Sequence, residues 1–350
     1  MDIRIVTEKD AASFRYIAEE CYRVFKELGN KVDVQDWSVA TVDDAPQNVL
    51  FIGYAYWGTI TFCQRWLGRS KVVFYSTNEG IPIFDAYTRK IALDTAIVAP
   101  SKFCEGMFKA AEIEVKGVVH HGVNMEAKSD DAYTEALDKY IGKRRVLLCV
   151  ASNDIRKGLD KLLVAYKLVQ REIGDTFLIL HSSHKKLISG SGMRGHFDLD
   201  NMISTLQLDN VWVTDMGGAF TSAQMQSLYK KAYVYCMSSL SEGFGLPALE
   251  AKRWDVPTVA IEALPFAEYI KNMDTGILIP TKKVWWYDYP ERYSPRMKFH
   301  MKEYSVDEYA DALLKLLKSE KLREMLSKKI DKTKSAWDSS SLYPKLLEYF

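Results

Sequence analysis

Residues 241–251 combine carboxylates, glycines and a proline in a spacing that suits the binding of a phosphorylated ligand. The run reads Ser-Glu-Gly-Phe-Gly-Leu-Pro-Ala-Leu-Glu-Ala and follows the apolar segment 232–237, which has the composition of a buried strand. Gly243 and Gly245 leave backbone amides open to a ligand, and Pro247 suits the first position of a helix because its missing N–H would be unpaired there. The free amides and the positive dipole end of such a helix start attract phosphate.

The two carboxylates of this run indicate that the phosphorylated ligand also carries sugars. Glu250 lies three residues after Pro247 in the predicted helix, where it can accept hydrogen bonds from a ribose diol. Glu242 precedes the glycines and can accept hydrogen bonds from sugar hydroxyls at the other end of the ligand. The alternative is an ordinary strand-to-helix turn whose glutamate only stabilises the helix dipole. We favour a nucleotide-sugar over a bare nucleotide.

This run resembles the E-x7-E signature of retaining GT-B glycosyltransferases, in particular the large GT4 family, whose Glu-Gly-Phe-Gly-Leu-Pro-x-Leu-Glu-Ala pattern is complete here. The resemblance implies that Glu242 orients the donor sugar together with backbone amides and that Glu250 holds the ribose. It also implies that the donor lies on the second of two domains and the acceptor mainly on the first, with no metal or other cofactor required. The donor-binding residues that it assigns in the run are Gly243, Phe244, Gly245, Leu246 and Glu250.

A basic pair lies where the family places cations on the donor diphosphate. Arg156 and Lys157 belong to the run Ser-Asn-Asp-Ile-Arg-Lys-Gly at residues 152–158, after the first predicted strand of the second domain. Arginine can bind phosphate oxygens bidentately and lysine adds a compact charge, which suits the charge that develops on a departing diphosphate. Many relatives carry an earlier Gly-Arg where this chain has Ala151 and Ser152. We therefore assign catalysis to Glu242, Arg156 and Lys157, with the alternative that one cation is a solvated charge at a helix start.

Two stretches of the first domain are candidates for the opposite wall of the site. Gly58 ends the run Gly-Tyr-Ala-Tyr-Trp-Gly, which resembles the glycine-bearing loop that faces the donor, although a tight turn is the alternative. Many relatives place a histidine near the sugar, but residues 75–80 read Tyr-Ser-Thr-Asn-Glu-Gly. Asn78 or Glu79 would have to replace that histidine.

Other polar clusters have ordinary explanations. The run 119–124 resembles a family segment at the end of the first domain, and a structural turn explains His120 and His121 at least as well as catalysis does. Asp198 and Asp200 spell a D-x-D triplet, but they lie in a polar stretch that we expect to be a surface loop. No third ligand is spaced to make zinc ligands of His181 and His184. The aromatic cluster of Trp285, Trp286, Tyr287 and Tyr289 is expected in a loop that packs against the terminal helices, with stacking on sugar rings as the alternative.

The composition is that of a globular protein and excludes several classes of function. The chain has 350 residues, a hydrophobic share of 47%, a charged share of 27% and a formal net charge of +1. We expect no nucleic-acid partner from this balance, and the lysine-rich C-terminal helices leave peripheral membrane contact open. Five widely spaced cysteines, the absence of a signal-like apolar stretch at the start and the absence of a membrane-length apolar run favour a cytoplasmic protein with reduced thiols.

Strand-like apolar runs alternate with helix-like periodic runs, which predicts a doubly wound α/β fold. We expect a GT-B arrangement of two Rossmann-like domains that face a central cleft: residues 1–125, a linker at 126–144, a nucleotide-sugar domain at 145–335, and a C-terminal helix at 336–350 that crosses back to the first domain. The expected strands lie at residues 3–6, 48–53, 71–75, 95–98, 115–120, 145–150, 176–181, 211–213, 232–237, 258–261 and 276–279. The expected helices include residues 11–28, 157–172, 306–317 and 321–337.

These features predict a retaining glycosyltransferase that moves a sugar from a nucleoside-diphosphate sugar to a glycan, lipid-linked or protein-linked acceptor. Positioning and stabilisation of the leaving diphosphate would carry the reaction. We expect Glu242→Ala to abolish transfer and leave folding intact, because a carboxylate in a cleft is not a core group. The alternative is a nucleotide-sugar-binding protein of the same fold with weak or no turnover.

Overall fold

The computed structural model describes the whole chain except residues 41, 43–45, 184–195, 216–219 and 289–296, and it contains two parallel sheets. In the first sheet the strand order is β2-β1-β3-β4-β6-β7. Its strands are β1 (Asp2–Thr7), β2 (Lys31–Asp36), β3 (Asn48–Gly53), β4 (Lys71–Ser76), β6 (Ala96–Ala99) and β7 (Gly117–Val118), and its helices are α1 (Ala12–Glu27), α2 (Trp57–Cys63), α3 (Ala86–Asp94) and α4 (Lys102–Ala110). Every residue of β3 is buried, as expected for a central parallel strand covered by helices on both faces.

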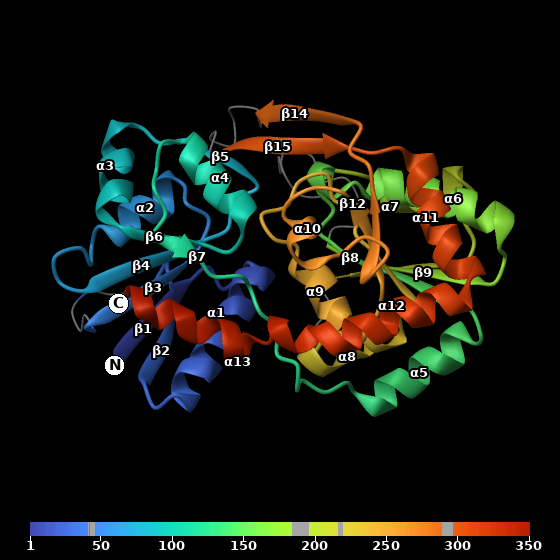
Figure 1. The fold of residues 1–350 in the computed structure, drawn as a ribbon, viewed down its shortest axis with the longest axis horizontal. Helices are drawn as coiled ribbons and strands as arrows, with labels where there is room; N and C mark the ends of the chain where they lie inside the picture. The colour runs from blue at the N-terminus through green and yellow to red at the C-terminus, as the bar shows by residue number, and fades with distance from the viewer. Residues whose placement is uncertain (41, 43–45, 184–195, 216–219, 289–296) are drawn as a thin grey trace.

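The second sheet has the strand order β10-β9-β8-β11-β12-β13. Its strands are β8 (Arg145–Val150), β9 (Thr176–Ser182), β10 (Val211–Asp215), β11 (Val234–Cys236), β12 (Thr258–Ile261) and β13 (Gly276–Ile279). The helices packed around it are α5 (Asp131–Ile141), α6 (Leu159–Glu172), α7 (Leu199–Thr205), α8 (Ser222–Lys231), α9 (Leu246–Arg253), α10 (Phe266–Tyr269), α11 (Val306–Lys318) and α12 (Glu320–Thr333). The two sheets lie side by side in Figure 1, which confirms the expected pair of Rossmann-like α/β units.

A small antiparallel sheet joins the two halves of the molecule. It consists of β14 (Lys283–Asp288), β15 (Met297–Glu303) and β5 (Gly80–Pro82), and Figure 1 shows β15 reaching from the second half to β5 in the first. The expectation of a loop for the aromatic cluster is therefore wrong for residues 285–287, which lie in β14 and pair with β15, while residue 289 lies outside the described residues. Because β15 supplies a partner strand, these aromatic residues extend a sheet.

The C-terminal segment returns to the first half of the molecule, as expected. After the 3-10 helix η3 (Lys334–Trp337), α13 (Ser339–Leu342) and the 3-10 helix η4 (Tyr343–Tyr349) pack against α1. In Figure 1 this red segment runs across the lower half of the molecule and ends near the N-terminus. The buried Tyr343 hydroxyl donates to the Gly122 carbonyl at 3.1 Å, and Arg23 of α1 donates to the Ser339 hydroxyl at 2.9 Å.

Several element boundaries differ from the expected ones for local reasons. The helix expected from residue 157 begins at Leu159, because Gly158 adopts a left-handed backbone (φ 60°) after the 3-10 turn η1 (Ile155–Lys157). A side chain at this position would lie 2.4 Å from the Ser238 carbonyl oxygen, so glycine is required. Asp198 is the exposed residue before α7, and its carboxylate caps that helix by accepting from the Asn201 amide at 2.9 Å, whereas Asp200 lies in the helix and not in the expected loop.

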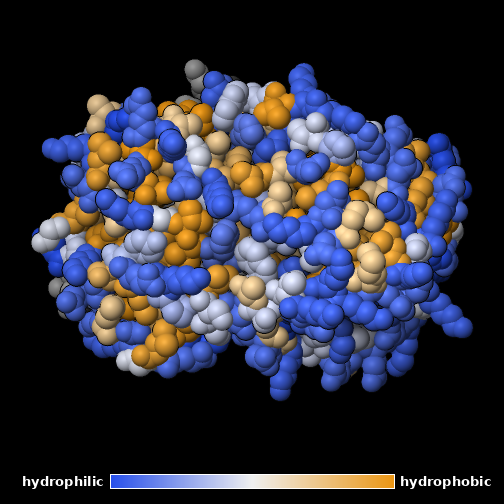
Figure 2. All heavy atoms as spheres, in the orientation of Figure 1, coloured by the Kyte–Doolittle hydropathy of each residue, from blue (hydrophilic) through white to orange (hydrophobic). Residues whose placement is uncertain are grey.

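Polar residues cover much of the surface. Figure 2 shows hydrophilic residues over most of the lower right, where α5, α8 and α12 lie, and apolar groups broken up by charged residues over the first half. All five cysteines are free and buried. Among the described residues, no helix is long and apolar enough to cross a bilayer.

Candidate functional site

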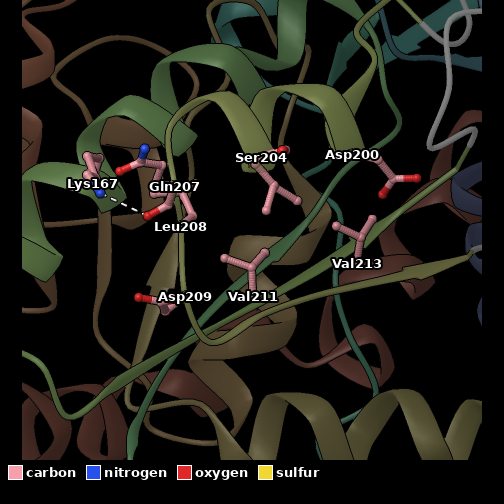
Figure 3. A pocket seen from close by; sticks show the side chains of 9 residues that line it. Lys167, Asp200, Ser204, Gln207, Leu208, Asp209, Val211 and Val213 are labelled. Atoms are coloured by element: carbon pink, nitrogen blue, oxygen red, sulfur yellow. Dashed lines mark hydrogen bonds between the residues drawn. The ribbon is translucent and has the colours of Figure 1, made fainter.

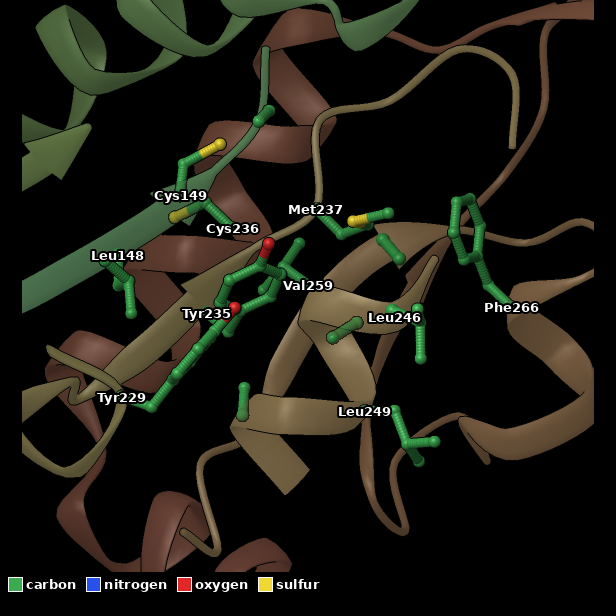
Figure 4. Close-up of a cluster of buried hydrophobic side chains, with 14 of the residues drawn as sticks. Leu148, Cys149, Tyr229, Tyr235, Cys236, Met237, Leu246, Leu249, Val259 and Phe266 are labelled. Atoms are coloured by element: carbon green, nitrogen blue, oxygen red, sulfur yellow. The ribbon is translucent and has the colours of Figure 1, made fainter. Parts of the chain in front are cut away.

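The Glu-Gly-Phe-Gly turn connects β11 to α9 at the carboxyl edge of the second sheet. Gly245 precedes α9 with φ 92°, and a side chain there would lie 2.9 Å from Phe266 and Tyr269 atoms, so only glycine fits. Pro247 occupies the first turn of α9, as expected. Figure 4 shows α9 anchored by Leu246 and Leu249 among the buried side chains beneath it, which fixes the position of the turn.

Aromatic packing holds Phe244 between the two halves of the molecule. Its ring stacks on Tyr269, with centroids 5.2 Å apart, and contacts His121 of the first half edge-on at 5.0 Å. The Tyr269 hydroxyl donates to the carbonyl oxygens of Phe244 and Gly245, at 3.2 and 3.0 Å. The backbone of the turn is therefore held from both sides.

The expected catalytic residues of the second half lie together. Arg156 and Lys157 follow the carboxyl end of β8, and Glu242 follows that of its neighbour β11, so parallel pairing brings them to one edge. Glu242 is only 6% exposed and accepts from the Lys157 ammonium and, at 2.7 Å, from the Ser239 hydroxyl. Burial raises the pKa of Glu242, but Lys157 and Arg156 outweigh that effect and hold the pKa below its ordinary value. Glu242 is therefore a permanent anion.

Arg156 joins both halves of the molecule through its guanidinium. It lies 3.1 Å from the Glu79 carboxylate of the first half and 3.5 Å from Glu242, and it donates to the Ser241 carbonyl at 3.2 Å. Asp154, at 3.8 Å, is a further anionic neighbour. Burial lowers the pKa of Arg156, but these carboxylates, Glu79 above all, raise it well above its ordinary value.

Glu79 is the first-half member of this group and is 3% exposed. Its carboxylate accepts from the Tyr54 hydroxyl at 2.9 Å, and its carbonyl oxygen accepts from the Ser241 hydroxyl at 2.9 Å and the His300 amide at 3.1 Å. Burial raises the pKa of Glu79, and the attraction of Arg156 opposes that rise only in part. We call Glu79, Arg156, Lys157 and Glu242 the interdomain charge cluster.

The turn that was expected to be open is covered by the first half. A side chain at Gly243 would lie 2.6 Å from the Thr77 methyl carbon and 2.8 Å from the Asn78 carbonyl oxygen. The Gly243 carbonyl accepts from the Ser101 hydroxyl at 2.6 Å. Asn78 is fully buried, and its side-chain NH₂ has no hydrogen-bond partner in the described part of the chain. The charge cluster is therefore sealed between the halves, which differs from the expectation that Glu242 lies in an open cleft.

The remaining candidates make contacts within their own halves of the molecule. Gly58 lies at the start of α2, where an added side chain would meet the Tyr56 ring at 3.0 Å. Glu250, in α9, accepts from the buried Tyr229 hydroxyl at 2.8 Å. Burial raises the pKa of Glu250 to about 7, although Tyr229 and Arg253 oppose the rise. Glu250 therefore changes its charge near neutral pH.

The two histidines make structural contacts. His121 is buried between the Tyr75 hydroxyl, at 2.8 Å, and the Thr77 hydroxyl, at 3.0 Å, and burial lowers its pKa to about 3. His120 lies 2.9 Å from the Glu268 carboxylate. That carboxylate also accepts from the amides of Lys102 and Phe103, at 3.0 and 3.3 Å, and so caps α4 from the other half of the molecule. Sequence reasoning missed this contact of Glu268, because only the tertiary arrangement brings the two segments together.

The described residues contain no group of three potential metal ligands, and Asp198 and Asp200 lie at the exposed start of α7. The groove in Figure 3, of about 520 Å³, lies beside α6, α7 and β10 and includes none of the charge-cluster residues. Within it, the Lys167 ammonium donates to the Gln207 carbonyl at 2.8 Å. This groove is separate from the candidate site.

Known proteins resemble this chain in both sequence and structure. Residues 138–285 match the family described as Glycosyl transferases group 1. A protein of Sulfolobus islandicus rod-shaped virus 1, described as uncharacterized glycosyltransferase 335, is 24% identical over an alignment of 288 residues that covers 79% of this chain and 79% of that protein. Sucrose-phosphate synthase from Thermosynechococcus elongatus has a similar structure, with a TM-score of 0.74 and 13% identity over 99% of this chain and 98% of that one.

A structure of Anabaena HepE, described as a complex with UDP-glucose, gives a TM-score of 0.74 with 14% identity over 99% of this chain and 98% of HepE. The chain shares the fold of these two proteins, which is the expected GT-B arrangement of two Rossmann-like domains. The interdomain charge cluster lies outside the carboxyl ends of β8 and β11. That edge is where open α/β sheets bind their ligands.

Proposed function

We propose that this chain is a glycosyltransferase that moves a sugar from a nucleoside-diphosphate sugar to a saccharide or lipid-linked acceptor with retention at the anomeric carbon, without a metal, in the cytoplasm. The observation that carries the proposal is the convergence of Arg156 and Lys157 on Glu242 beside the start of α9. Two cations at a helix start, Arg156 buried and Lys157 partly buried, are suited to a diphosphate and unsuited to a neutral ligand. The similarity to HepE, whose structure is described as a complex with UDP-glucose, supports a donor of this class.

In this mechanism the cations and the helix start stabilise the departing diphosphate. Negative charge grows on the diphosphate as the glycosidic bond breaks, so Arg156 and Lys157 are stabilising most in the transition state. A diphosphate oxygen takes the proton of the acceptor hydroxyl, which then attacks from the face that the leaving group has vacated. Glu242 accepts hydrogen bonds from the sugar and stays ionised throughout, consistent with its lowered pKa. Glu250 holds the ribose.

Domain separation must precede donor binding in this proposal, because residues 77–79 cover the turn. Closure over the bound donor then excludes water and limits hydrolysis of the donor. The same covered turn favours a second candidate function, a nucleotide-sugar-binding protein in which turnover is weak or absent.

Release of nucleoside diphosphate separates the two functions. The chain is incubated with a panel of nucleoside-diphosphate sugars and saccharide acceptors in the presence of EDTA, and the released diphosphate is measured. Acceptor-dependent release with an anomer of unchanged configuration supports the proposed transferase. Tight binding of a donor without release supports the binding protein. Lys157→Ala should abolish release, whereas Lys167→Ala, in the separate groove, should leave it unchanged.

A further inference from the structure

Protein carboxylates surround the Arg156 guanidinium, although its buried Nε has no hydrogen-bond partner among the described residues. Glu79, Glu242 and Asp154 surround it at 3.1, 3.5 and 3.8 Å, and Arg156 is 8% exposed. An incoming diphosphate can form a paired contact with this guanidinium only if one carboxylate leaves. The way in which the donor binds depends on which of these carboxylates leaves.

The two carboxylates of the second half are held independently of the Arg156 guanidinium. Asp154 accepts from the Arg156 backbone amide at 3.0 Å and so belongs to the same 3-10 turn. Glu242 keeps the Lys157 ammonium and the Ser239 hydroxyl as partners. Both would stay in place if the halves of the molecule moved apart.

Glu79 is held less firmly and belongs to the other half. Besides Arg156, its carboxylate bonds to the Tyr54 hydroxyl, which moves with it. Its raised pKa reflects a cost of burial that its partners offset only in part. The neighbouring strand β5 pairs with β15 over only three residues, so the connection that carries Glu79 is short.

We propose that Glu79 occupies the diphosphate position on Arg156 in the resting chain and is exchanged for the donor's diphosphate on binding, so that Glu79 limits donor affinity. This inference rests on the proposed function. It changes the expected role of Glu79, which was a contact to the donor sugar. Exchange also breaks the hydrogen bonds that the Glu79 carbonyl accepts from Ser241 and His300. Diphosphate binding therefore separates the halves, which close again only over a complete donor.

Inorganic pyrophosphate is the probe, because it carries the diphosphate charge without base or sugar. Its affinity is measured by calorimetry for the unmodified chain, Glu79→Gln and Glu268→Gln. Glutamine keeps the size of Glu79 and can still bond to Tyr54, but it removes the competing charge. We expect pyrophosphate to bind at least about tenfold more tightly to Glu79→Gln, a factor that corresponds to about 1.4 kcal/mol.

Glu268→Gln is the matched control. It weakens another buried carboxylate contact between the halves, with His120 and α4, without touching Arg156. An equal gain in both variants would mean that looser halves, and not anion exchange, raise the affinity, and would overturn the inference. Unchanged or weaker pyrophosphate binding in Glu79→Gln would also overturn it.

Two further readouts keep the inference testable. Small-angle scattering of the unmodified chain should give a larger radius of gyration when pyrophosphate is saturating, and a constant or smaller radius at saturation would contradict the exchange even if Glu79→Gln does not fold. Turnover assays separate the two proposals. If Glu79→Gln binds pyrophosphate more tightly but the chain transfers sugar from no donor, the proposed transferase activity is wrong and the exchange is supported. If the chain transfers sugar but Glu79→Gln does not bind pyrophosphate more tightly, the exchange is wrong and the transferase activity is supported.

Discussion

Replacement of Glu242 by alanine should destabilise the whole chain as well as abolish transfer. Glu242 is buried between the Lys157 ammonium and the Arg156 guanidinium, so its loss leaves Lys157 with an unbalanced charge at the contact between the halves. Removal of one partner from a buried ion pair costs about 3–5 kcal/mol. Because Arg156 keeps Glu79 and Asp154, we expect the lower end, about 3 kcal/mol. The sequence alone predicted that Glu242→Ala leaves folding intact, whereas the buried position of Glu242 predicts a loss of stability.

Urea unfolding, extrapolated to water, measures this loss. Urea is preferred over guanidinium chloride because salt screens charge interactions. Glu172→Ala is the matched control: Glu172 pairs with Lys318 at 2.9 Å, but both side chains are more than half exposed. Such pairs contribute at most about 1 kcal/mol. Glu242→Ala could lower the free energy of unfolding no more than the control does. The charge cluster would then be open to water in solution, and Glu242 would not be buried between the halves.

Three further variants test the covered turn and the binding residues. Gly243→Ala should lower the free energy of unfolding in urea by about 1–3 kcal/mol, because its methyl group would collide with Thr77 and Asn78. Gly106→Ala, in open space on α4, should raise the free energy of unfolding by about 0.5–1 kcal/mol. Equal effects of the two changes would contradict the packing of Gly243 against the first half. Nucleoside-diphosphate affinity should rise as pH increases through about 7, because Glu250 loses its proton and its carboxylate can then accept hydrogen bonds from both ribose hydroxyls. Calorimetry should find no such rise in Glu250→Gln. A rise that persists in this variant would place the ribose elsewhere. Trp286→Ala should raise the acceptor KM several-fold and leave the donor KM unchanged, because this 42% exposed ring offers a face to a sugar; a changed donor KM would refute that role.

The two parallel sheets were predictable because their central strands are uninterrupted apolar runs. β8 and β12 have the predicted bounds, since buried parallel strands do not alternate with polar residues. β2 was missed because Lys-Val-Asp-Val-Gln-Asp is polar, as an edge strand can be. β15 was also missed, although Met297, Phe299 and Met301 alternate with less buried residues and carry a period-two signal.

The candidate site was predictable within each half but not across the contact between them. Strand-end positions place Arg156, Lys157 and Glu242 on one edge, and that follows from the order of sequence elements. The approach of Glu79 to Arg156 depends on how the halves dock, and the sequence has no periodic signal for it. The same holds for the Glu268 cap on α4.

The contact between the C-terminal segment and α1 has a consequence for biosynthesis. Tyr343 and Leu346 are completely buried, and Ser339 bonds to both Glu20 and Arg23. A ribosome makes about 5–20 residues per second. The half of the molecule that is synthesised first thus cannot acquire its final layer until residues 339–346 have been made, and α1 has to remain uncovered on that side while more than three hundred further residues are added.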